Sequence, residues 1–106
     1  MLNGYVYLIG ETNNSGKYKI GSTRKININE RIKELQTGNP NELYLKDSFK
    51  TNKPFRLETM LHKHYQNLNE NGEWFDLNEE EVTNFKNVCE KYQRIIDSLK
   101  DNPFFK

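Results

Sequence analysis

The stretch from Gly4 to Arg31 constrains the fold most, because it holds two short apolar runs separated by a polar loop. Residues 4–10 read Gly-Tyr-Val-Tyr-Leu-Ile-Gly, and residues 17–23 read Lys-Tyr-Lys-Ile-Gly-Ser-Thr. The loop between them is rich in Asn, Ser and Gly, which supply the backbone angles that a chain reversal needs. The pattern predicts an antiparallel β-hairpin.

Alternation assigns the side chains of this hairpin to two faces, since successive strand residues point to opposite sides of a sheet. One face should pack on the core and carries Val6, Leu8, Tyr18 and Ile20. The opposite face combines phenols, ammonium groups and two smaller residues: Tyr5, Tyr7, Ile9, Lys17, Lys19 and Gly21. Two phenols beside two lysines, ahead of an arginine, make this face the candidate functional surface.

Three amphipathic segments outside the hairpin predict helices. The first follows Asn27, a residue type that caps helix N-termini, and it should end near residues 38–40. The second begins near Pro54, which suits a first helical turn, and the third follows Asn78. Residues 42–50 predict a third strand, whereas residues 68–72 have the composition of a loop.

These elements predict an α/β (α+β) fold, a small three-stranded antiparallel sheet with flanking helices and a C-terminal helix. At 106 residues the chain has length for one domain, which we place at residues 1–100, with residues 101–106 as a tail. Cys89 is the single cysteine, so a disulfide framework and a multi-cysteine zinc site are excluded. We expect that thiol to be a buried apolar group.

Charge is unevenly distributed, although the formal net charge is only +1. Lysine and arginine dominate residues 17–33, where Glu30 is the one acid, and acids alone are charged in residues 70–81. A basic patch at the hairpin would attract nucleic-acid phosphates, and the alternative is a solvated face. The apolar run of residues 5–9 is too short for a secretion signal or a membrane span, so we expect a soluble intracellular protein, cytoplasmic or nuclear.

The ordered set of motifs resembles the GIY-YIG nuclease superfamily. Tyr5-Val6-Tyr7 stands where Gly-Ile-Tyr stands in that family, and Lys19-Ile20-Gly21 stands where Tyr-Ile-Gly stands. The chain is more narrowly similar to the phage and DNA-virus branch that includes the meiotically up-regulated proteins. The motifs that carry this likeness are Lys-Ile-Gly-Ser-Thr, an Arg followed by Glu34-Leu35, Leu57-Glu58 with Leu61-His62, and Glu73-Trp74-Phe75.

This resemblance, which covers residues 4–77, implies a metal-dependent endonuclease that hydrolyses DNA phosphodiester bonds with Mg²⁺ or Mn²⁺. It implies Tyr7 as the general base, Arg31 as the phosphate-stabilising cation and Glu58 as the metal-binding carboxylate, with Lys19 in the second-tyrosine position. Further substrate contacts are expected from Tyr5, Lys17, Ser22, Arg24, Lys25 and His62. DNA is the expected partner, and a homodimer stays open.

Two positions depart from the family pattern. A tyrosine has a reference pKa of about 10, and a nearby ammonium group favours the phenolate, so we expect Lys19 to lower the pKa of Tyr7. Many family members carry a His or Tyr where this chain has Leu35. His62 follows Glu58 by one helical turn and is a candidate to point at the same site.

Other interpretations of the same residues remain open. Tyr7 alone would be an ordinary strand aromatic, Lys19 could protect a sheet edge, and Arg31 with Glu58 could be a surface ion pair. The alternative function is a non-catalytic nucleic-acid-binding module that retains the fold. A third is a protein-interaction domain that uses the acidic residues 79–81 and the Phe-rich tail.

Overall fold

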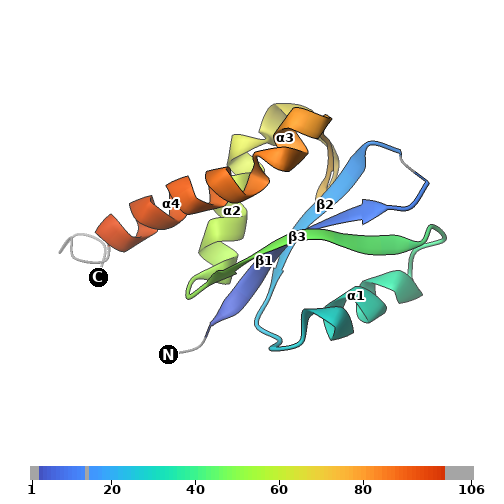
Figure 1. Ribbon diagram of the computed structural model, residues 1–106, viewed down its shortest axis with the longest axis horizontal. Coiled ribbons are helices and arrows are strands. Elements are labelled where there is room, and N and C mark those ends of the chain that lie inside the picture. Colours follow the sequence, from blue (N-terminus) through green and yellow to red (C-terminus); the bar gives the residue numbers. More distant parts are fainter. Residues whose placement is uncertain (1–2, 14, 100–106) are drawn as a thin grey trace.

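The computed structural model describes residues 3–13 and 15–99, and it contains a five-stranded antiparallel sheet between helices (Figure 1). The strands are β1 (Gly4–Glu11), β2 (Lys17–Thr23), β3 (Leu43–Thr51), β4 (Asn69–Asn71) and β5 (Trp74–Asp76), in the spatial order β3-β1-β2-β5-β4. The helices are α1 (Ile28–Thr37), α2 (Pro54–His64), α3 (Glu79–Thr83) and α4 (Phe85–Leu99), with a short 3₁₀ turn at Gln66–Leu68. Helix α1 covers one face of the sheet, and the other helices lie on the opposite face.

The predicted hairpin is confirmed. β1 and β2 pair antiparallel from Tyr5–Thr23 to Gly10–Tyr18, and Tyr7 lies opposite Gly21. Gly16 ends the connecting loop with a φ of +79°, a backbone angle that glycine adopts without steric strain. The register of this hairpin fixes which residues of β1 and β2 share a face.

The prediction of only three strands is wrong, because residues 69–76 form a second, smaller hairpin beside β2. β4 and β5 have three residues each, too few to display the alternation that identifies a strand in a sequence. Gly72 makes the turn between them with a φ of +58°. The segment predicted as the loop 68–72 is therefore partly sheet.

The predicted helices form, and two of the predicted caps are confirmed. The side chain of Asn27 accepts from the backbone N–H of Asn29, and Asn78 forms a capping box with Glu81. The last helix differs from the prediction because it is divided into α3 and α4 at Asn84.

The main core lies between the sheet and the helices α2, α3 and α4. Val6, Leu8 and Ile20 supply its sheet side, as alternation predicted, and Tyr18 packs against it. Leu57 and Leu61 of α2, with Phe85, Cys89 and Ile96 of α4, are among the residues that supply its helical side. Burial raises the pKa of the Cys89 thiol to about 12, in keeping with a packing role.

The face that carries Tyr7 is covered, in contrast to the open surface that we expected. Tyr7, Ile9 and Leu43 form a second core, against which Ile28, Ile32, Leu35, Leu45 and Trp74 pack. Tyr7 has no solvent-exposed surface. The apolar stripe of α1 explains this cover, because an amphipathic helix must bury that stripe against the sheet.

None of the helices formed by the described residues is long and apolar enough to cross a membrane. The predicted tail, residues 101–106, lies outside the described residues.

Two glycines offer a matched test of how tightly Tyr7 is packed. A Cβ atom on Gly21 would lie 2.4 Å from the Tyr7 hydroxyl oxygen, whereas a Cβ on Gly38 would meet nothing within 4 Å. We expect Gly21→Ala to lower the free energy of unfolding by roughly 1–3 kcal/mol, the usual effect of overpacking, and Gly38→Ala to change it little. Chemical denaturation measures both variants, and equal stabilities would contradict this packing.

The Tyr65 hydroxyl is buried and has no hydrogen-bond partner among the described residues, which is unfavourable in an apolar surrounding. We expect Tyr65→Phe to raise the free energy of unfolding by about 1 kcal/mol, because it removes only the unpaired oxygen. The control is Tyr92→Phe, since the Tyr92 hydroxyl is hydrogen-bonded to His64 Nδ1 at 2.9 Å. A destabilised Tyr65→Phe variant would show that this hydroxyl has a partner in solution.

Candidate functional site

The candidate functional site lies at the part of strand β2 that strand β5 does not reach. β5 pairs with β2 only from Lys17 to Lys19, and the backbone N–H of Ile20 still donates to the carbonyl of Glu73. Beyond that point, on the side away from β1, no strand among the described residues pairs with residues 21–23. An unpaired sheet edge leaves polar groups available for other partners.

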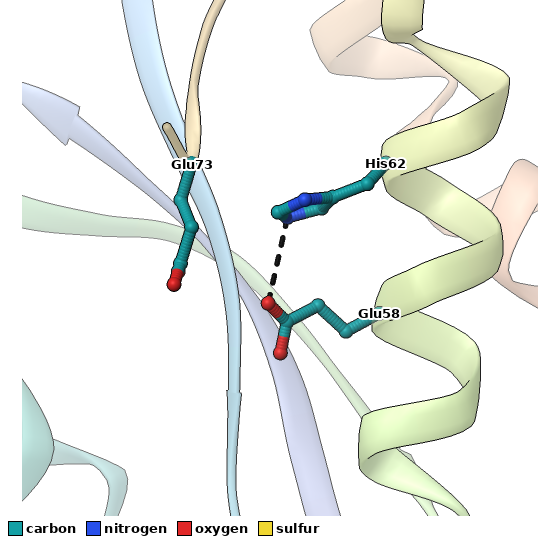
Figure 2. Close-up of side chains that lie close together, drawn as sticks. All are labelled: Glu58, His62 and Glu73. Carbon is teal, nitrogen blue, oxygen red and sulfur yellow. Dashed lines mark ion pairs between the residues drawn. The ribbon is translucent and has the colours of Figure 1, made fainter. Parts of the chain in front are cut away.

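Helix α2 places two side chains on this edge. Figure 2 shows Glu58 and His62 projecting from α2 toward the segment that carries Glu73. The ring of His62 places Nε2 2.7 Å from the carbonyl oxygen of Ile20 and 3.5 Å from Glu58 Oε2. Because a carbonyl only accepts, Nε2 must carry the proton and donate it. Glu58 Oε1 accepts from the hydroxyl of Ser22, which is almost fully buried.

Glu73 faces these two residues from the other side of the gap, immediately before β5 (Figure 2). Lys19 forms an ion pair with Glu73 at 3.4 Å, and its side chain is only 17% exposed. The lysine also lies 5.8 Å from the centroid of the Trp74 ring. Lys19 is therefore held between a carboxylate and an indole.

The Tyr7 side chain extends from β1 over the neighbouring strand β2, toward the same edge of the sheet. Its ring lies over Gly21, the residue opposite it in the register, as the short distance from a Cβ at this position indicates. The Tyr7 hydroxyl accepts a hydrogen bond from Arg31 Nε at 3.3 Å. The phenol thus packs on Gly21, while Glu58 is hydrogen-bonded to the next residue, Ser22, whose side chain points to the opposite face of the sheet.

Burial raises the pKa of Tyr7 above its ordinary value. The hydrogen bond from Arg31 and its positive charge oppose this shift, while the charges of Glu73 and Glu58 add to it. Lys19, which we expected to lower this pKa, is not among the main causes of the shift. The cation beside the phenol is Arg31, and Lys19 neutralises Glu73 instead.

Glu58, His62 and Glu73 could together hold a cation, because each offers one ligand atom and these atoms lie within 4.8 Å of one another. Carboxylate oxygens are the ligands that Mg²⁺ and Mn²⁺ prefer. Opposite ligands of Mg²⁺ are about 4 Å apart, so small side-chain rotations would bring the two carboxylates to one ion. His62 fits a supporting role better, because Nε2 already donates to Ile20 and lies beside Glu58.

Of the other residues predicted to contact substrate, Lys17 lies far from Glu58, His62 and Glu73. Lys25 pairs with Glu34, which also pairs with Arg31, each at 3.4 Å. Arg24 is exposed above the ring of Phe55, and Tyr5 is half-buried two residues before Tyr7. Lys17 pairs with Glu70 at 3.0 Å at the opposite end of β2, about 16 Å from Ser22 along an extended strand.

Glu73 is the residue that sequence reasoning missed. It belongs to the Glu73-Trp74-Phe75 motif, but within the acidic stretch 70–81 it had no distinguishing feature. Its pairing with Lys19 would have identified Glu73 as a site residue. That pairing can be predicted only when residues 74–76 are recognised as a strand beside β2. Leu35, at the position where many GIY-YIG proteins have a ring, packs into the second core.

Comparison with protein families gives a match over most of the chain. Residues 4–90 match the T5orf172 domain, which is found in phage proteins and related nucleases and is associated with nuclease and DNA-binding function. No curated protein and no solved structure matches the chain. Because the match spans most of the sequence and includes every element that forms the site, this chain belongs to the T5orf172 domain family.

Proposed function

We propose that this protein is a metal-dependent DNA endonuclease of the GIY-YIG type. The proposal is carried by the groups around the edge of β2: the Tyr7 ring packs on Gly21, and Glu58 of α2 is hydrogen-bonded to Ser22. Arg31 of α1 donates to the phenol, and the charge of Glu58 acts on the pKa of the same phenol. Phosphodiester hydrolysis requires a base for the attacking water and positive charge for the developing phosphorane. Family membership supports action on DNA.

Glu58 and Glu73 would hold Mg²⁺ or Mn²⁺, with His62 orienting Glu58. When bound, the cation would polarise a phosphodiester oxygen and stabilise the charge that develops on it. Ser22 fixes one oxygen of Glu58 from the sheet, and Lys19 balances the charge of Glu73. Both carboxylates are therefore held by side chains of β2 before any substrate binds.

Arg31 has two tasks in this proposal. Its side chain is 35% exposed and connects the buried hydroxyl of Tyr7 with Glu34 at the surface. A DNA phosphate would compete with Glu34 for the guanidinium, because bidentate contacts to phosphate are favourable for arginine. Moving the guanidinium toward the phosphate would uncover the hydroxyl, so that substrate binding and exposure of the base are coupled.

The second candidate function is a DNA-binding module without turnover. The complete burial of Tyr7 and its raised pKa favour this reading, because a general base must reach water and lose its proton. Binding to DNA that weakens steeply with salt, without cleavage under Mg²⁺ or Mn²⁺, would select it.

We expect Glu58→Gln to reduce nicking of supercoiled plasmid in Mg²⁺ or Mn²⁺ by at least about 100-fold, the usual loss when a transition-state-stabilising group is removed. Glutamine keeps the size of the side chain and removes the charge that would hold the cation. The matched control is Glu90→Gln, because Glu90 lies exposed on α4. Equal nicking by both variants and the wild type would point to a contaminating nuclease.

The pH dependence of the cleavage rate tests whether Tyr7 is the general base. A raised pKa means that the folded protein holds the phenolic proton more tightly, so Tyr7 is protonated at neutral pH. If Tyr7 is the base, the cleavage rate should rise about tenfold per pH unit above neutrality, as the phenolate fraction does. Tyr7→Phe should abolish that rise and Tyr92→Phe should keep it. A Tyr7→Phe variant with the wild-type profile would exclude Tyr7 as the base.

A further inference from the structure

A hollow of about 230 Å³ lies beside the catalytic cluster, on the face of the sheet covered by α1. It opens between the C-terminal end of that helix and strand β5, and the residues that line it include Lys19, Glu34, Leu35, Gly38, Leu43 and Trp74. Pockets for drug-sized ligands have volumes of roughly 300–1,000 Å³, so this one suits a single small ring system.

The walls of the hollow suit a planar aromatic group. Trp74 is half-buried, and both its place in the sheet opposite Lys19 and its packing on the second core hold the ring. Leu35 and Leu43 add apolar surface. Glu34 offers carboxylate oxygens that can accept hydrogen bonds from the exocyclic amino group of a nucleobase. A base can stack on a tryptophan whatever its identity.

The hollow is continuous with the proposed catalytic site on two sides. Lys19 lines it and is paired with Glu73, and Glu34 lines it and is paired with Arg31. A nucleotide whose base entered here would have its own phosphate beside Lys19 and Arg31. This arrangement connects the hollow to a DNA strand rather than to a free small molecule.

We propose that this hollow binds one unstacked base of the DNA strand being cleaved, an inference that rests on the proposed function. A base inside a duplex is paired and stacked, so it would have to leave the stack to reach Trp74. The preferred substrate would therefore carry an unpaired nucleotide next to the scissile bond, as single-stranded or branched DNA does.

Trp74 is the only tryptophan of the chain, so tryptophan fluorescence reports on this wall alone. The test titrates the protein, in EDTA to prevent cleavage, with a single-stranded oligodeoxynucleotide and with an abasic oligomer of the same length. Both present phosphates, but only the first presents bases. We expect both to bind with salt dependence and only the base-containing strand to quench Trp74.

Gly38 provides a variant that fills the hollow without touching the catalytic cluster. Its φ is −99° and a Cβ there meets nothing within 4 Å, so a larger side chain fits without backbone strain. Gly38→Leu should remove the quenching and weaken binding of the base-containing strand by roughly 5- to 150-fold, the range for one lost stack. Gly38→Ala, which leaves most of the hollow open, should retain both.

The outcomes separate this inference from the function on which it rests. Binding of both oligomers without quenching, or equal quenching by both, would overturn the base site and leave the nuclease proposal standing if plasmid is still nicked. Quenching that persists in Gly38→Leu would also overturn it. Absence of DNA binding at low salt, together with absence of nicking, would overturn both proposals.

Discussion

The close approach of the Tyr7 ring to Gly21 is the contact on which the site depends. Any side chain at position 21 would occupy the space of the phenol, so the ring can cross β2 only because that residue is glycine. This packing brings the hydroxyl over the neighbouring strand, next to Ser22, which is hydrogen-bonded to Glu58 from the other face. The same contact closes the second core beneath α1. Folding and the placement of the proposed base therefore rest on one packing interaction.

The shortness of β5 explains why the carboxylates can meet at β2. The N–H and the carbonyl of Ile20 both point to the edge of β2 that lies away from β1. Glu73 accepts from the N–H, and His62 donates to the carbonyl. The histidine thus takes the position that a longer β5 would occupy. Because a helix side chain replaces a strand there, α2 can bring Glu58 to the edge without leaving buried polar groups unpaired.

Much of the fold follows from sequence periodicity. The hairpin, the third strand and the starts of α1, α2 and α3 are visible because each has a repeating apolar pattern or a recognisable cap. The second hairpin was missed because three-residue strands show no period, and Glu73 was missed with it. The cover over Tyr7 was also missed, although the apolar stripe of α1 had been identified. An apolar stripe shows that a helix must pack against another element. Only the register of the sheet shows which of its two faces the helix covers.

The same missing strand accounts for the misassigned partner of Lys19. From the sequence, Lys19 has only Tyr7 as a neighbour of interest on its face, and an ammonium group beside a phenol would favour ionisation. Once β5 is placed, Lys19 forms an ion pair with Glu73 at 3.4 Å, and only the lysine of this pair is mostly shielded from water. An aromatic ring at position 19 would leave Glu73 without this cation beside a second carboxylate. Lys19 and Glu73, the acid before Trp74, are therefore best understood as one coupled pair.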